Sequence, residues 1–141
     1  MLFRSSPTSV AYLDYPGSGV ETIAHLRDDG RITLLFCAFS GAPKLVRIYG
    51  HGRALEPGDA DYARLLPTFH VLLPPRAIIV IDVERVADSC GYGVPRYEYQ
   101  GERDQLLDWA ERKGEDGLER YQRDKNATSI DGLPGLRRFK P

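Results

Sequence analysis

Two stretches of this sequence carry side chains that could hold a charged, aromatic ligand. The first is a predicted strand, residues 45–53, in which every second residue is polar and lies on one face: Arg47, Tyr49, His51 and Arg53. Arginine contacts phosphate in a bidentate manner, and tyrosine or histidine stacks on a flat ring. This strand face carries no carboxylate, so it favours an anionic ligand such as a flavin nucleotide. An ordinary solvent-exposed sheet face is the alternative.

The second stretch is the predicted start of a helix: Ser18, Gly19, Val20, Glu21 and Thr22. A helix N-terminus presents unpaired N–H groups and partial positive charge, so it suits a phosphate, and glycine lets a ligand approach the backbone. The same S-x-x-E pattern also forms a capping box, in which serine and glutamate satisfy the helix start without any ligand. Both interpretations remain open at this point.

The remaining chemistry-bearing residues give weaker signals. The run Cys90-Gly91-Tyr92-Gly93-Val94-Pro95 could line a ligand ring, although a structural turn is the simpler interpretation. The three histidines show no ligand spacing with one another or with either cysteine, so no metal site is predicted. No residue is identified as a general acid, general base or nucleophile, and the catalytic residues are therefore unknown.

Length and composition are those of a globular domain. With 141 residues, 42% hydrophobic and 28% charged, the chain is expected to form a single domain over 1–141, with a helical part from about residue 102. The formal net charge of −1 recruits neither nucleic acid nor an anionic membrane surface. Two cysteines do not make a disulfide framework, and no signal peptide or membrane span is recognised, so a cytoplasmic protein is expected.

The pattern of apolar residues predicts an α+β fold with an antiparallel sheet, because strands come first and helices gather near the C-terminus. Strands are predicted at 9–14, 31–39, 44–55, 77–86 and 97–99, and helices at 18–29, 60–66, 102–113 and 115–126. The strand at 31–39 is apolar in both parities, so both of its faces must be covered, and a second subunit is a common cover. Gly50 and Gly52 would allow the next strand to bend sharply or to bulge.

Several of these segments together resemble the pyridoxamine 5′-phosphate oxidase-like family, in its uncharacterised bacterial branch. The resemblance lies in the order and spacing of the following motifs: Val10-Ala11-Tyr12-Leu13-Asp14, Gly17-Ser18-Gly19, Gly30-Arg31-Ile32, Phe36-Cys37-Ala38-Phe39, Arg47-Ile48-Tyr49-Gly50, Val83-Glu84-Arg85-Val86, Ser89-Cys90-Gly91-Tyr92-Gly93-Val94-Pro95 and Ser129-Ile130-Asp131-Gly132-Leu133-Pro134-Gly135-Leu136. No single motif is strong, but the similarity covers nearly the whole chain.

The resemblance implies a split β-barrel, a homodimer, and FMN bound at the subunit interface. It places the cofactor contacts on the stretch 15–22, through Ser18, Gly19, Val20, Glu21 and Thr22, and on the strand that carries Arg47 and Tyr49. It implies an FMN-dependent oxidoreductase that acts on an unidentified small molecule. Two alternatives stay open: a non-catalytic dimeric module that has lost flavin binding, and a deazaflavin-dependent reductase on the same fold.

Overall fold

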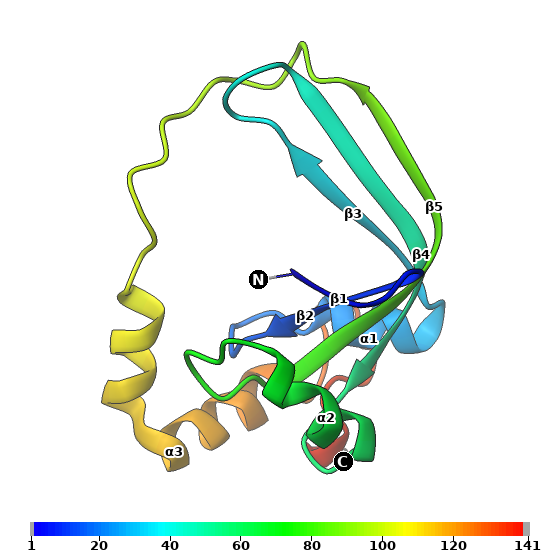
Figure 1. The fold of residues 1–141 in the computed structure, drawn as a ribbon. Helices are drawn as coiled ribbons and strands as arrows, with labels where there is room; N and C mark the ends of the chain where they lie inside the picture. Colours follow the sequence, from blue (N-terminus) through cyan, green and yellow to red (C-terminus); the bar gives the residue numbers. More distant parts are fainter. Residues whose placement is uncertain (1, 140–141) are drawn as a thin grey trace.

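The computed structural model describes residues 2–139, in which five strands and three α-helices follow one another (Figure 1). The elements are β1 (Leu2–Ser6), β2 (Ser9–Asp14), α1 (Glu21–Asp28), β3 (Arg31–Cys37), β4 (Lys44–Leu55), α2 (Ala60–Leu65), β5 (Ala77–Cys90) and α3 (Gln105–Asn126), with short 3-10 turns at Leu66–Thr68 and Arg137–Phe139. The strand β1 was not predicted, whereas β2 and β4 have the expected bounds. The strand β3 ends two residues before the expected position 39, and β5 continues to Cys90, beyond the expected end at residue 86, because it stays paired with β4.

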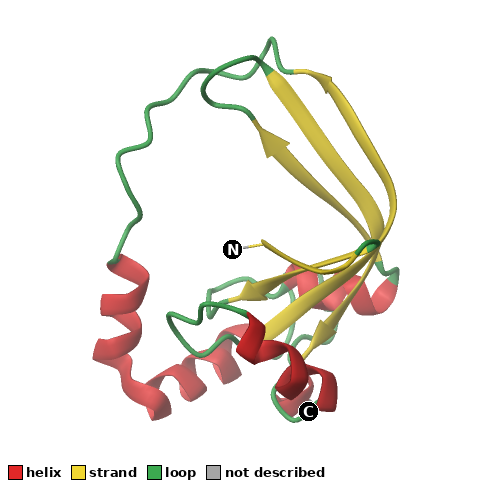
Figure 2. Cartoon of the chain, viewed as in Figure 1, coloured by secondary structure: helices red, strands yellow, loops and turns green. Residues whose placement is uncertain are grey.

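The five strands form one antiparallel sheet in the order β1-β2-β5-β4-β3. This confirms the α+β class with an antiparallel sheet. The barrel, however, is not closed: within the described residues β1 and β3 are the two edges of the sheet, and no ladder joins them. A barrel closes only when its edge strands pair, so the chain by itself forms an open, curved sheet (Figure 2).

A bulge between β4 and β5 accompanies the bend of the sheet. The register shifts between Tyr49 and Gly50, because β5 carries one extra residue there, Glu84. Gly50 is buried at this point, and a Cβ on it would collide with the backbone carbonyl oxygen of Asp82. The glycine predicted to permit a bulge is therefore required by the close approach of the two backbones.

Helices cover both faces of one half of the sheet. On one face Ile23 and Leu26 of α1, together with Leu136, pack on Ile79 and Ile81. On the other face α2 packs on the alternate residues of the same strand, which include Ile78 and Val80. The first five residues of β5 are therefore buried on both faces, which explains why the sequence there is apolar in both parities.

The other half of β3, β4 and β5 extends past the helices as an arm, defined here as residues 33–37, 44–49 and 85–90 (Figure 1). Its large apolar side chains are exposed, with Leu35 at 53%, Phe36 at 40% and Val86 at 61% of their full accessible area. Leu35 and Phe36 are neighbours in a strand and so lie on opposite faces. The apolar pattern predicts that both faces of the arm are covered, but in the single chain neither face is covered.

A long loop, residues 91–104, returns from the tip of the arm to α3 (Figure 2). The strand predicted at 97–99 is wrong: this segment has no strand pairing, and its backbone tie is a single hydrogen bond from Tyr97 N–H to the Phe39 carbonyl at 3.0 Å. The two helices predicted on either side of Gly114 are both present, and together they make up α3. The helix is kinked at Gly114, because the φ of 63° and ψ of 176° of this residue are not helical.

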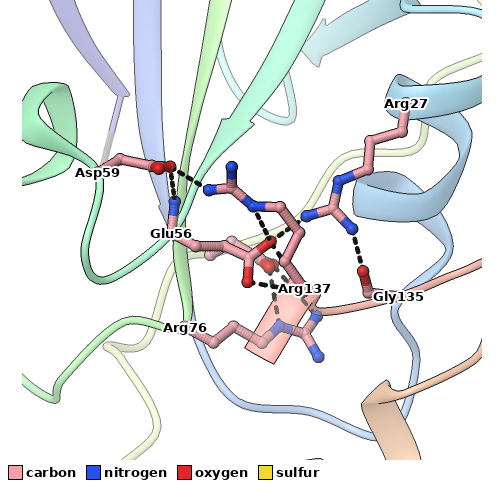
Figure 3. A network of polar contacts seen from close by, with 7 residues as sticks. Arg27, Glu56, Asp59, Arg76, Gly135 and Arg137 are labelled. Carbon is pink, nitrogen blue, oxygen red and sulfur yellow. Dashed lines mark hydrogen bonds and ion pairs between the residues drawn. The ribbon is translucent and has the colours of Figure 1, made fainter. Parts of the chain in front are cut away.

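An ionic cluster around the buried Glu56 ties the C-terminal segment to the end of β4 (Figure 3). The carboxylate of Glu56, a residue only 3% exposed, accepts hydrogen bonds from the Arg27 guanidinium and from the Arg137 backbone N–H at 2.9 Å. Asp59 accepts from the Glu56 backbone N–H at 2.8 Å and from the Arg137 side chain. Arg27 also donates to the carbonyl of Gly135. These contacts fix the segment that packs against α1.

Candidate functional site

Two polar side chains form hydrogen bonds with the loop before α1. The Gly17 carbonyl accepts hydrogen bonds from Arg76 at 3.1 Å and from Asn126 at 2.9 Å. Val20 is 1% exposed and belongs to the core. The helix begins at Glu21, and Val20 is its N-cap residue with no side-chain cap. The predicted start at residue 18 and the predicted Ser18 cap are therefore wrong, because burial of Val20 places Ser18 outside the helix.

The carboxylate of Glu21 turns back over the start of α1. Its Oε1 accepts a hydrogen bond from the Ile130 backbone N–H at 3.2 Å. The backbone N–H groups of Glu21 itself and of Ile130 hold the pKa of this carboxyl below its ordinary value. A Cβ on Gly19 would collide with the same carboxylate. The space beside Gly19 that could admit a phosphate is thus filled by the protein's own anion, and the helix start as it stands does not fit a second one.

The strand face predicted to be purely basic is in fact partly neutralised. His51 Nδ1 lies 2.8 Å from Oε1 of Glu84, and Arg53 Nη1 donates to Oδ2 of Asp82 at 2.9 Å. Both acids come from β5, which pairs with β4 along its whole length. The expectation of a face without carboxylates is wrong, because it considered β4 alone and the neighbouring strand contributes to the same face.

The arm half of this face keeps its positive charge. Arg47 donates to the Ser89 hydroxyl at 3.0 Å, and the Arg85 guanidinium lies 5.1 Å from the centre of the Tyr49 ring. Across the described residues, no carboxylate lies within ion-pair distance of either arginine. Arg47 pairs with Ala87 and Tyr49 with Arg85, so the two arginines are diagonal neighbours on adjacent strands. This group of Arg47, Tyr49 and Arg85, which we call the arginine face, fits an anionic group.

The two predicted halves of the site do not meet within one chain. The helix α1 reaches β4 at Gly52, where Leu26 packs and where Gly52 N–H donates to the Gly30 carbonyl at 2.8 Å. Arg47 lies five residues further along the strand, which corresponds to about 16 Å at the usual rise per residue. Its side chain is bonded to Ser89 rather than to any group of the loop that precedes α1.

A cleft of about 670 Å³ lies beside the arginine face. It is formed by α1, the β3–β4 ladder, the bulge of β5 and the loop at 131–133, and its lining residues are as follows: His25, Asp28, Asp29, Arg31, Ile32, Thr33, Tyr49, Gly50, His51, Glu84, Asp131 and Leu133. We call it the histidine pocket. Tyr49 belongs both to the arginine face and to this pocket, so the two are continuous. Of the other predicted site residues, Thr22 lines a smaller adjoining cleft of about 280 Å³ that also includes His25.

Sequence reasoning missed the acidic and basic residues that β5 and the C-terminal loop contribute. Asp82, Glu84 and Arg85 follow the apolar run at the start of β5, and this change from apolar to charged residues was the available signal. The pairing of Asp131 with His25 gave no signal, because the two residues are 106 positions apart in the sequence. Over the described range 2–139, no group of three or more His, Cys, Asp or Glu side chains is placed to hold a metal ion. In that same range, no helix has the length and apolar character needed to cross a bilayer.

Comparison with known proteins gives one curated relative. A pyridoxamine 5′-phosphate oxidase family protein, ustO of Aspergillus flavus, is 39% identical over 148 residues, which include 93% of this chain and 59% of the relative. The chain thus spans less than two thirds of the length of the curated relative that it matches. No family model matches the chain.

Two crystal structures of HupZ from Group A Streptococcus show a distant structural likeness. Both are 20% identical to this chain, with TM-scores of 0.47 and 0.44. The first covers 62% of this chain and 72% of the HupZ chain, and the second covers 60% and 66%.

The match to this curated relative confirms the predicted resemblance: the chain is similar to a pyridoxamine 5′-phosphate oxidase family protein over nearly its whole length.

Proposed function

We propose that this chain binds FMN and takes part in the oxidoreduction of a small molecule, with the cofactor shared between two copies of the chain. The cofactor would supply the redox chemistry, and the protein would hold its phosphate and shape a pocket for the substrate. The family resemblance supports the choice of FMN.

The arginine face is the observation that carries this proposal. Arg47 and Arg85 are diagonal neighbours on adjacent strands, Arg85 lies over the Tyr49 ring, and neither arginine has a carboxylate partner among the described residues. A guanidinium pair of this kind binds a phosphate, and the Tyr49 ring offers a flat surface for a fused aromatic system. The face adjoins the histidine pocket, so an anionic ligand and a second small molecule could lie next to each other.

The exposed arm supports the involvement of a second copy of the chain. The arm exposes large apolar side chains on both faces, among them Leu35, Phe36 and Val86. Large exposed apolar side chains on a sheet are typical of an interaction site. A partner chain would cover the arm and would bring its own groups to the arginine face, where one chain supplies only half of the expected contacts.

A non-catalytic dimeric module is the second candidate, and Glu21 favours it. Its carboxylate fills the helix start that the family resemblance assigns to the cofactor phosphate. Such a module would keep the arm and self-associate but would bind no flavin.

The experiment is a titration of the purified protein with FMN, followed by flavin fluorescence and by thermal unfolding. Binding to the native state must raise the melting temperature, and FMN at a hundred times its Kd stabilises by about 2.7 kcal/mol. Replacing Arg47 by alanine removes hydrogen bonds to a charged group, each of which contributes about 1.5–3 kcal/mol. We therefore expect Arg47→Ala and Arg85→Ala each to weaken FMN binding by roughly 10- to 100-fold.

The matched control is Arg53→Ala, on the same strand face but paired with Asp82. It should leave FMN affinity within about threefold of the wild type. Absence of any FMN binding or thermal shift, together with self-association in sedimentation, would favour the non-catalytic module. A shift with a deazaflavin but none with FMN would favour the deazaflavin-dependent reductase.

A further inference from the structure

The histidine pocket contains a histidine that is oriented by a distant acid. His25 Nε2 lies 2.8 Å from Oδ2 of Asp131, and both residues line the pocket. His25 comes from α1, whereas Asp131 comes from the loop that follows α3. The pair therefore depends on the fold and not on any local motif.

Asp131 is held in place by a tight turn. The Ser129 hydroxyl donates to Oδ1 of Asp131, and Ser129 is 6% exposed. The turn is closed by Ser129 N–H to the Leu133 carbonyl at 2.9 Å and by Leu133 N–H to the Ser129 hydroxyl at 3.0 Å. Gly132 takes the left-handed φ of 85° that this turn needs. These hydrogen bonds orient the half-exposed carboxylate of Asp131 toward His25.

The hydrogen bonds of Asp131 decide which ring nitrogen of His25 is available. The Ser129 hydroxyl and the His25 ring hold the pKa of the Asp131 carboxyl below its ordinary value, so it is ionised at neutral pH and can only accept hydrogen bonds. The Nε2 atom must then carry the proton of the pair. In the neutral ring Nδ1 therefore has the free lone pair and is a hydrogen-bond acceptor.

The charge of the pocket limits what can bind there. Four carboxylates line it, from Asp28, Asp29, Glu84 and Asp131, against one guanidinium from Arg31. That guanidinium is paired with Asp29 at 2.7 Å. An anionic ligand would be repelled here, in contrast to the arginine face next to it.

We propose that the histidine pocket binds a small molecule without negative charge, which donates an N–H or O–H hydrogen bond to Nδ1 of His25, with Asp131 as the positioning residue. The assignment of this molecule as the substrate rests on the proposed function. The binding itself needs no flavin and is tested on the protein alone.

The test uses three probes of similar size and different charge: benzamidine (cationic), benzyl alcohol (neutral) and benzoate (anionic). Protein labelled with ¹⁵N in its histidine rings and backbone is titrated with each probe by NMR. We expect benzamidine and benzyl alcohol to shift the His25 ring and the Thr33 amide, and benzoate to shift neither.

Asp131→Asn tests the positioning role. The ¹⁵N ring shifts of neutral His25 should report the Nε2–H tautomer in the wild type and a mixture of tautomers in the variant, with at least fivefold weaker binding of benzyl alcohol. The control is Glu111→Gln, an exposed acid on α3, which should change neither reading. The proposal is overturned if benzoate binds as tightly as benzamidine, or if Asp131→Asn leaves both the tautomer and the affinity unchanged. Failure of FMN to bind would leave these readings untouched, so the two proposals fail separately.

Discussion

Removing the charge of Glu56 should destabilise the fold measurably. In Glu56→Gln the shape is kept, but the Arg27 guanidinium and the Arg137 side chain lose the carboxylate that faces them. Breaking a fully buried ion pair costs about 3–5 kcal/mol, because a charge is left without a partner. Here the arginine side chains are 27% and 46% exposed and can be partly hydrated, so the expected loss is about 2 kcal/mol.

The assay is urea unfolding at fixed protein concentration, because self-association would otherwise contribute to stability. The midpoint should fall while the m-value stays constant, and the melting temperature should drop by roughly 6 °C for a chain of this length. The control is Glu119→Gln, whose partner Arg123 is exposed on the same helix. That pair contributes about 0.5 kcal/mol or less.

A double-mutant cycle separates the ion pair from other effects of the substitution. If Glu56 and Arg27 stabilise the fold through each other, Arg27→Ala should cost about 1 kcal/mol less in the Glu56→Gln background than in the wild type. The reasoning is refuted if Glu56→Gln costs no more than Glu119→Gln, or if the two substitutions at the cluster are additive.

Three further outcomes are expected. In urea unfolding, Gly50→Ala should lower the free energy of unfolding by about 2 kcal/mol, because the new methyl group would collide with the Asp82 carbonyl. Gly17→Ala, with open space around it, should cost less than about 1 kcal/mol. Equal costs would contradict the close approach of the backbones at the bulge. Backbone N–H groups lower the pKa of Glu21 in the folded protein, so its stabilising contribution is complete above its ordinary pKa of 4.5 and is lost as the pH falls through the lower folded value. Glu21→Gln should therefore weaken the dependence of the unfolding free energy on pH in the acidic range. An unchanged dependence would count against this role. Burial raises the pKa of Tyr12 to about 12, so ultraviolet titration should show one tyrosine ionising above the others, and its loss in Tyr12→Phe would identify it.

Local patterns predicted most elements of the fold. Two signals were local: the apolar run that forms the buried part of β5, and the glycine that interrupts α3. Each determines the conformation of only a few neighbouring residues, so each can be recognised from the sequence alone. The start of α1 was misplaced, because burial of Val20 in the core outweighed the capping signal of Ser18 and Glu21. The segment 97–99 has strand-forming residues but no neighbouring strand with which to pair.

The site was harder to predict, because its charges come from several elements. The basic residues of β4 were recognised, but the acids that pair with them depend on the register of β5, which includes the extra residue Glu84. One residue more or less would have turned those acids to the opposite face. The His25–Asp131 pair joins a helix to a distant turn, and no short-range pattern encodes it.

The strand β5 belongs to two environments at once. Its first residues lie under helices on both faces, and its last residues belong to the uncovered arm. Amide hydrogen exchange should therefore be slow over 78–81 and much faster over 86–89 in an isolated chain. If exchange at 86–89 slows as the protein concentration is raised while exchange at 78–81 stays the same, a second copy has bound to the arm. The buried amides of β5 thus serve as the reference against which its exposed amides report assembly.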